Sequence, residues 1–340
     1  MGMTEEDGLA PSAEFLDLFR AHAGPGGAIT FAEFMSLALY DPRVGYYRSG
    51  RPRVGRKRGT DFFTSTALGP VFGGLIAAAC EVLLGGADPA DYEFVEIGAE
   101  PEAVPRGGIL AGVANRFGGV RALGFGDSLN LGGQCVVFSN ELFDAQPFSR
   151  FVFRGGSWRE LGVEIAGAAL AEVELVGAPK VALPPAAAEG YVLDAPLGAG
   201  LLLDRIAAQP WSGLFVACDY GKTWAELAGA VPAGTARAYH RHVQSNDLLA
   251  RPGRQDLTCH ICWDWLSSGL ARHGFVDSRI DSQEAFFVRH AGGAISAAIE
   301  ADAAAFSPRK AAILELLHPA HLGQKFQVLH ALRGESHRPV

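Results

Sequence analysis

The sequence contains only five cysteines in 340 residues, too few for a disulfide framework in a chain of this length. Reduced cytosolic thiols are the simpler interpretation. The first residues, MGMTEEDGLA, show neither the basic and apolar segments of an export signal nor the arginine-rich character of a mitochondrial presequence. We therefore expect a cytoplasmic protein.

An excess of positive charge is also missing. The chain has 29 lysines and arginines against 37 aspartates and glutamates, a net charge of −8, which argues against a general nucleic-acid binder. Residues 51–58 form one basic cluster, which is typical of a solvated loop, although a phosphate or nucleic-acid role is the open alternative. No uninterrupted apolar run looks long enough to span a bilayer, so we expect no membrane partner.

What the sequence does contain is typical of a globular protein with a large core. Hydrophobic residues make up 49% and charged residues 19%, enough for one large domain with an insertion or for two smaller domains. Strand patterns at 92–98, 120–125, 134–139 and 213–221 alternate with helical patterns. This alternation predicts an α/β fold with a doubly wound sheet.

Three further segments have distinct patterns. A capping box at Thr30 and Glu33 predicts the second of two helices in an N-terminal helical region. Residues 148–176 alternate in period two around Gly155-Gly156, which predicts a β-hairpin insertion. Residues 256–275 have amphipathic spacing, which predicts a helix that ends at a glycine.

The stretch QCVVFSNELFDAQP, residues 134–147, is the best candidate for a reaction centre. Its apolar start predicts a buried strand, which is followed by Asn140, Glu141 and Asp144. In an open parallel sheet, ligands bind beyond the carboxyl ends of the strands. The alternative is that Asn140 and Asp144 only form a turn while Glu141 points into water.

Several blocks occur together in a familiar order: ITFAEFMSLALYDPRVGYY, GTDFFTS, NELFDAQP, CDYG, GTARAYHRH, PGRQDLTCH and LGQKFQVL. In this combination the chain resembles the MidA-like (DUF185) S-adenosylmethionine-dependent methyltransferases, whose mitochondrial members methylate an arginine of a respiratory complex I subunit. The resemblance implies a Rossmann-like class I methyltransferase fold. It places an N-terminal helical region and substrate-side loop at 1–90, and the methyltransferase domain at 91–340 with a β insertion at about 148–180.

The resemblance also implies S-adenosylmethionine as cofactor and a protein side chain, arginine, as acceptor. Two carboxylates, Glu141 and Asp144, would hold the guanidinium and receive the released proton, while Asn140 orients the acceptor nitrogen. The residues expected to line the cofactor site are Glu96, Gly98, Asp61, Thr64 and Ser65.

The cofactor half departs from the family pattern. Where the family has a loop close to E-x-G-x-G-x-G, this chain reads EIGAEPE at 96–102, and Thr66-Ala67 stands where the family usually has Pro-Glu. Only 36 positions separate Gly98 from Gln134, so we expect a sheet shortened between its first and fourth strands. Asp127 follows a weak strand at the wrong distance for the acid that holds a ribose. A catalytically degenerate relative that binds a partner protein without cofactor is therefore the alternative function.

A C-x-x-C motif at Cys259 and Cys262 raises the question of a metal. A structural zinc site needs four ligands, and no second pair occurs at a suitable spacing. We expect two buried thiols and no metal at this motif. The sequence does not indicate an oligomeric state.

Overall fold

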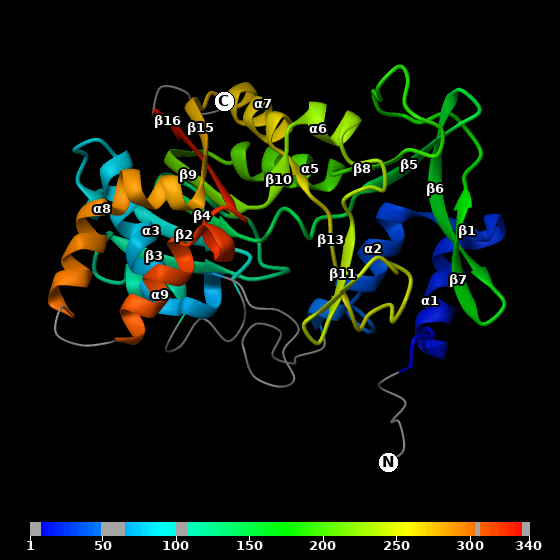
Figure 1. Ribbon diagram of the computed structural model, residues 1–340, viewed down its shortest axis with the longest axis horizontal. Coiled ribbons are helices and arrows are strands. Elements are labelled where there is room, and N and C mark those ends of the chain that lie inside the picture. The colour runs from blue at the N-terminus through cyan, green and yellow to red at the C-terminus, as the bar shows by residue number, and fades with distance from the viewer. Residues whose placement is uncertain (1–7, 49–64, 100–107, 303–306, 335–340) are drawn as a thin grey trace, which may run out of the picture. The chain divides into compact units, whose positions relative to one another are not determined.

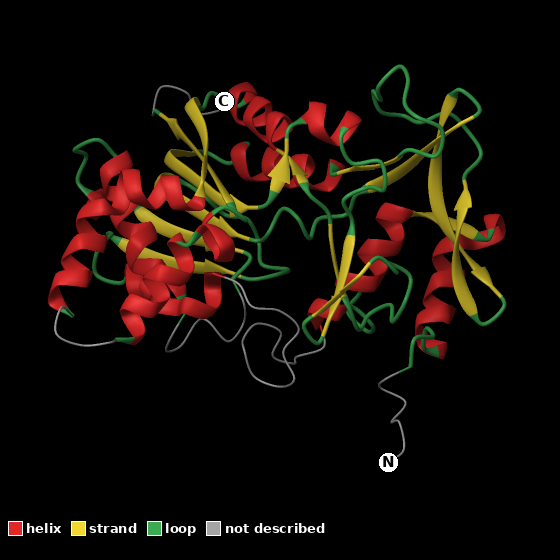
Figure 2. Cartoon of the chain, in the orientation of Figure 1, coloured by secondary structure: helices red, strands yellow, loops and turns green. Residues whose placement is uncertain are grey.

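The computed structural model describes residues 8–48, 65–99, 108–302 and 307–334. The chain forms two compact units that interleave along the sequence (Figures 1 and 2). The N-terminal unit comprises Met1–Phe62, Asp144–Ala199 and Lys222–Cys262, and the sheet unit comprises Phe63–Phe143, Gly200–Gly221 and Trp263–Val340. The predicted division into an N-terminal region at 1–90 and a methyltransferase domain at 91–340 stays a prediction.

A six-stranded sheet forms the centre of the sheet unit, in the order β15-β16-β9-β4-β2-β3 (Figure 1). Strands β2, β3, β4 and β9 are parallel, whereas β16 is antiparallel to both of its neighbours. The strand bounds are β2 (Glu93–Ile97), β3 (Gly119–Leu123), β4 (Gly133–Asn140), β9 (Trp211–Asp219), β15 (Val276–Ser282) and β16 (Gln327–Arg333). The α/β prediction is confirmed. Of the residues described between β2 and β4, only a short helix and one strand are regular, which agrees with the predicted shortening.

Helices pack on both faces of this sheet. Along β9, Leu214 and Val216 belong to the core that contains α3 and α8, whereas the intervening Phe215 contacts Phe275 on the other face. The helices are α3 (Gly69–Leu83), α4 (Ile109–Val113), α5 (Leu197–Ala207, which begins in the N-terminal unit), α7 (Trp263–Arg272), α8 (Gln283–Ala301) and α9 (Pro308–Leu317), with short turns η4 (Ser65–Leu68), η5 (Pro89–Asp91) and η6 (Pro319–Gly323).

One helical segment is more apolar than we expected. Residues Ser65–Leu83 form a helix that is long and apolar enough to cross a membrane by length and composition, so the expectation of no such run is wrong. Half of this segment is buried, and Phe72, Leu75 and Ile76 lie in the core of the sheet unit. The apolar character of α3 is thus accounted for by its packing in this core.

The N-terminal unit is built mainly from antiparallel strands and short α-helices. Its elements are α1 (Ala13–Ala23), η2 (Gly24–Gly26), β1 (Ala28–Thr30), α2 (Phe31–Tyr40), η3 (Tyr46–Arg48), β5 (Ser149–Arg154), β6 (Ser157–Ala166), β7 (Ala169–Glu174), β8 (Val192–Ala195), β10 (Gly221–Lys222), α6 (Trp224–Gly229), β11 (Arg237–His240), β12 (Val243–Ser245), β13 (Asp256–Thr258) and β14 (Ile261–Cys262). The capping box of α2 forms as predicted, since the Thr30 and Glu33 side chains each accept the other's backbone N–H. Strands β5, β6 and β7 form the predicted β insertion.

The helix predicted over 256–275 is partly wrong. Residues Asp256–Thr258 form β13, which pairs with β11, and α7 begins only at Trp263. The backbone N–H of Cys259 donates to Asp144 O at 2.8 Å, a long-range contact that helical spacing does not reveal. Tertiary pairing therefore overrides the local periodicity here.

Candidate functional site

The carboxyl ends of β2 and β4 lie side by side, with Ile97 paired to Ser139. Gly98 follows β2 with φ +82°, a left-handed conformation that glycine adopts without strain. The N–H groups of Gly98 and Ala99 both donate to Leu123 O, at 2.8 and 3.1 Å, which ties this turn to the end of β3. Glu96, the next-to-last residue of β2, is 4% exposed.

The turn after β4 is fastened to β9. The Glu141 N–H donates to Cys218 O at 2.9 Å, and the Phe143 N–H donates to Asp219 Oδ2 at 2.9 Å. Asp219 is fully buried, and its Oδ1 accepts the Tyr220 N–H. The position of the turn therefore depends on Asp219, a role that the sequence leaves open.

Glu141 has φ +50°, although it is not a glycine. Such a conformation costs free energy of about 1–3 kcal/mol in a non-glycine residue and clusters at functional sites. Its Oε1 accepts a hydrogen bond from Asn140 Nδ2 at 2.9 Å. The strained turn thus presents a carboxylate that is held in place by the neighbouring amide.

Asn140 connects this carboxylate to the start of the helical segment before α3. Its Nδ2 also donates to Thr66 Oγ1 at 3.0 Å, so the threonine that departs from the family's proline supplies a hydroxyl that sequence reasoning missed. The Oδ1 of Asn140 is buried and accepts no hydrogen bond from the residues described. The amide therefore has an acceptor available for an N–H group of a ligand, as the predicted orienting role requires.

The turns after β2 and β4 are in contact. A Cβ added to Gly98 would lie 2.8 Å from Leu142 Cδ1, closer than real Cβ contacts. The φ angle of Gly98 is also +82°, a value that glycine adopts without strain, so glycine is the residue that suits this position. The structure thus brings together Gly98, Asn140 and Glu141 at one edge of the sheet.

This contact gives a testable expectation for Gly98→Ala. The added methyl group would fill the space beside the turn after β4. The positive φ would also destabilise the alanine variant by about 1–2 kcal/mol. We expect the dissociation constant for S-adenosylmethionine to rise about tenfold, measured by isothermal titration calorimetry. Gly133→Ala is the matched control, because Gly133 has φ +69° at the opposite end of β4 with open space around it. An equal loss of affinity in both variants would contradict a specific role for Gly98.

Asp127 is a candidate that the sequence analysis set aside for its spacing. It follows β3, the strand next to β2, and its Oδ2 accepts the Gly124 N–H at 2.8 Å. A Cβ at Gly124 would lie 3.5 Å from Ala99 O, so this loop adjoins the turn after β2. Asp127 therefore lies in a loop that follows the strand next to β2 and adjoins the turn that contains Ala99.

The other predicted cofactor residues differ in their surroundings. Ser65 is fully buried, and its hydroxyl donates to Gln283 Oε1 at 3.2 Å. That contact ties η4 to α8, and a cofactor role for Ser65 stays a prediction. Asp61, Thr64 and the basic cluster at 51–58 lie outside the described residues.

Asp144 belongs to the N-terminal unit, unlike Glu141. Its side chain is buried, with the residue 3% exposed. Burial, followed by the charges of Asp256 and Asp144, raises the pKa of Tyr40 well above its usual value. The joint action of Glu141 and Asp144 on one acceptor stays a prediction.

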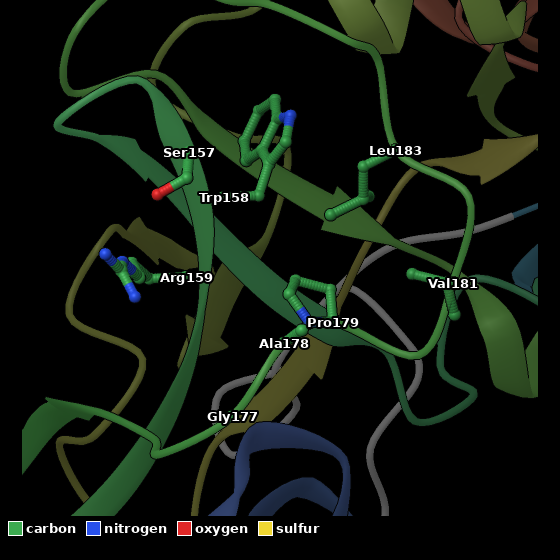
Figure 3. Close-up of a pocket in the computed structure, with 8 residues that line it drawn as sticks. All are labelled: Ser157, Trp158, Arg159, Gly177, Ala178, Pro179, Val181 and Leu183. Atoms are coloured by element: carbon green, nitrogen blue, oxygen red, sulfur yellow. The ribbon is translucent and has the colours of Figure 1, made fainter.

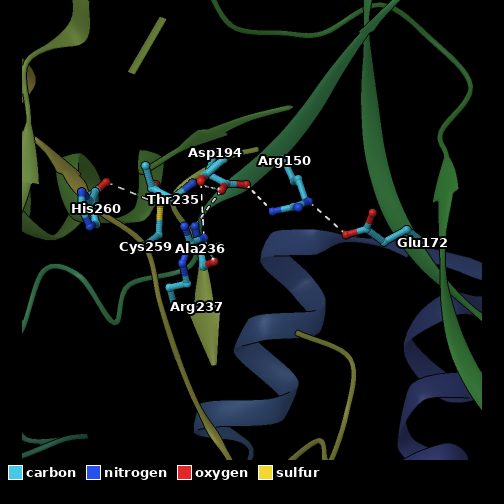
Figure 4. A network of polar contacts seen from close by, with 9 residues as sticks. Arg150, Glu172, Asp194, Thr235, Ala236, Arg237, Cys259 and His260 are labelled. Atoms are coloured by element: carbon cyan, nitrogen blue, oxygen red, sulfur yellow. Dashed lines mark hydrogen bonds and ion pairs between the residues drawn. The ribbon is translucent and has the colours of Figure 1, made fainter. Parts of the chain in front are cut away.

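A buried polar network holds the blocks GTARAYHRH and DLTCH together within the N-terminal unit (Figure 4). Asp194 Oδ2 accepts the N–H groups of Thr235 and Ala236 at 2.7 and 2.8 Å. Arg150 joins Asp194 at 2.7 Å to Glu172 at 3.0 Å. These contacts assign a structural role to Asp194.

Both thiols of the C-x-x-C motif are buried, as predicted. Cys259 Sγ lies 3.5 Å from Thr235 Oγ1, at the end of the same network. Burial, and then the charge of Asp194, raises the pKa of the Cys259 thiol well above its usual value. Cys259 is therefore a packed thiol rather than a reactive thiolate.

The β insertion carries a separate pocket of about 430 Å³ (Figure 3). It is lined by Ser157, Trp158, Arg159, Gly177, Ala178, Pro179, Val181 and Leu183. The Trp158 indole donates to Pro184 O at 2.8 Å, so this ring forms a fixed wall. Of these lining side chains only Arg159 is charged, and the pocket has no base that could take up a proton.

The chain is similar to a methyltransferase family model, to a mouse protein and to two solved structures. A family model described as "Putative S-adenosyl-L-methionine-dependent methyltransferase" matches residues 121–278. The mouse protein arginine methyltransferase NDUFAF7, mitochondrial, is 23% identical over 365 residues, which cover 88% of this chain and 80% of the mouse protein.

Two crystal structures of COG1565 superfamily proteins from Burkholderia thailandensis share the fold. One, bound to S-adenosyl-homocysteine, has a TM-score of 0.75 and 23% identity, and the other has a TM-score of 0.73 and 21% identity. Each comparison covers 95% of this chain and 94% of the other. The family model, the mouse relative and the ordered sequence blocks together support the resemblance of this chain to the MidA-like (DUF185) methyltransferases.

Proposed function

We propose that this protein transfers a methyl group from S-adenosylmethionine to an arginine side chain of a protein. The observation that carries the proposal is the edge of the sheet where the turn after β2 meets the strained turn after β4. There, Gly98 contacts the turn that presents Asn140 and Glu141. The family model, the arginine methyltransferase relative and the ligand-bound structural neighbour all support this function.

The described residues fit the cofactor. Gly98 keeps the backbone open at the end of β2, and Asp127 supplies a carboxylate after the next strand, where a ribose is held in related folds. Glu96 adds a buried carboxylate at the end of β2. S-adenosylmethionine, when bound, supplies an electrophilic methyl group on a sulfonium.

The acceptor residues follow from the chemistry of arginine. A guanidinium keeps its proton at neutral pH, since its pKa exceeds about 12, so the site has to hold a cation and accept a proton from it. Glu141 offers a carboxylate for both tasks, and Asn140 Oδ1 offers an acceptor that aligns an N–H group. Asp144 is proposed as the second carboxylate of this grip. Alignment of the two reacting groups is the main contribution that such a site makes to rate.

The second candidate function is protein binding without cofactor. The observation that favours it is the sequence EIGAEPE at 96–102, which keeps one glycine of the family loop. Calorimetric titration of the full chain with S-adenosylmethionine separates the two. We expect micromolar binding, and no heat at millimolar cofactor would overturn the enzyme in favour of a scaffold.

The acceptor is tested separately from the cofactor. Incubation of the full chain with a cell lysate and tritiated S-adenosylmethionine, followed by acid hydrolysis, should yield labelled methylarginine. Label in another amino acid would overturn arginine as the acceptor while leaving methyl transfer intact. We also propose a cytoplasmic location, which cell fractionation checks.

A further inference from the structure

We propose that His290, His330 and Asp281 form a binding site for one divalent transition-metal ion, and that the ion is Zn²⁺. Their candidate ligand atoms, two imidazole nitrogens and a carboxylate oxygen, all lie within 4.8 Å of one another. The three residues come from α8, β16 and β15 of the sheet unit, and none of them belongs to the candidate methyl-transfer site. The inference does not rest on the proposed function.

The sheet brings two of these residues together. Arg279 pairs with His330, and Asp281 pairs with Val328, in the antiparallel ladder between β15 and β16. Asp281 and His330 are therefore diagonal neighbours on the same face of the sheet. His330 Nε2 lies 3.8 Å from Asp281 Oδ2, too far for a hydrogen bond.

Helix α8 supplies the third residue. It starts directly after β15, with Ser282 as its N-cap, and so runs back over the same face. Phe286 and His290, four residues apart, share one side of the helix. The ring of His290 lies 5.4 Å from that of His330, and Phe286 packs against both rings at 5.3 and 5.7 Å.

Two unpaired nitrogens point to a ligand. The Nε2 atoms of His290 and His330 are both buried, and neither makes a hydrogen bond to the residues described. His330 is only 5% exposed, and buried polar atoms of this kind normally have a partner. One metal ion would engage both lone pairs and the carboxylate oxygen together.

Two arginines near the site reduce its negative charge, but they leave the Asp281 carboxylate able to bind a metal ion. Arg289 Nη1 lies 2.6 and 2.7 Å from the two oxygens of Asp281, and the charge of Arg279 also acts on His330. A carboxylate oxygen carries two lone pairs, so Asp281 can accept from Arg289 and still bind an ion. Two imidazoles and one carboxylate, with water in the fourth position, form a ligand set that suits Zn²⁺.

The test is calorimetric titration of the full chain with ZnSO₄ after removal of metals by a chelator. We expect one equivalent to bind, and His290→Ala to weaken binding more than about a hundredfold, beyond the loss that outer-shell changes cause. His290 is only partly buried, so this variant should keep the fold. If circular dichroism shows that it does not, Asp281→Asn carries the same test with less change in volume.

The matched control is His321→Ala. His321 lies in the same unit, with its Nδ1 3.1 Å from Glu315 Oε1, and it should leave the affinity and the stoichiometry for Zn²⁺ unchanged. The proposal is overturned if stoichiometric Zn²⁺ does not bind. It is also overturned if binding survives both His290→Ala and Asp281→Asn, or if it is lost in His321→Ala instead.

Discussion

Glu141→Gln should lower kcat for methyl transfer by about 10²–10⁴-fold, because a glutamine cannot take up the proton that the acceptor releases. The backbone N–H that donates to Cys218 O remains, and Asn140 can still donate to the side-chain oxygen. The dissociation constant for S-adenosylmethionine should therefore change by less than about twofold, a free-energy difference below 0.5 kcal/mol. Single-turnover transfer and calorimetry measure the two quantities separately. A large loss of cofactor affinity would place Glu141 on the cofactor side instead.

A second substitution at the same position distinguishes strain from chemistry. Glu141→Gly removes the carboxylate but also relieves the positive φ of +50°, so transfer should be lost while the unfolding free energy stays level or rises by up to about 1 kcal/mol. Asp277→Gly is the matched control, since Asp277 has φ +54° in the exposed part of β15. It should show the same relief of strain with activity retained. Loss of activity in both variants would mean that glycine itself is harmful at such positions.

The sequence predicted the strands that build the site but not how their ends are fastened. The apolar run before Ser139 and the polar residues after it are sufficient to predict β4 and its carboxylate. The roles of Asp219 and Thr66 depend on contacts with residues 76 and 74 positions away, and no local pattern encodes them. The conformation of Glu141 is likewise fixed by β9 and not by its own propensity.

Spacing along the chain and position in the sheet point in different directions for Asp127. Asp127 lies at the wrong distance from Gly98 for the usual ribose-binding acid, yet β3 pairs with β2 and places the loop that holds Asp127 beside the turn at Ala99. The segment around Cys259 shows the same limit, because strand pairing replaced the helix that its periodicity predicted. A spacing rule applies only where the connections between strands have their ordinary length. The order of the strands in a sheet does not depend on that length.

Asp194→Ala should lower the free energy of unfolding by about 3–5 kcal/mol, the range for removal of one partner from a buried ion pair. The side chain of Asp194 is fully buried, and that of Arg150 is 12% exposed. The substitution leaves the Arg150 guanidinium with Glu172 alone, and it leaves the N–H groups of Thr235 and Ala236 without their acceptor. Urea unfolding followed by circular dichroism measures the change.

Two further variants show whether the loss comes from burial of the unpaired charge. Asp194→Ala combined with Arg150→Met removes both charges and should recover part of the lost stability, because the orphaned guanidinium is gone while the two unpaired N–H groups remain. Glu174→Ala breaks a pair of the same chemistry in the same five-stranded sheet, between side chains that are 59% and 38% exposed, and should cost less than about 1 kcal/mol. Equal losses from Asp194→Ala and Glu174→Ala would show that burial does not set the strength of these pairs. A double variant no more stable than Asp194→Ala would instead assign the whole effect to the two backbone N–H groups that Asp194 holds.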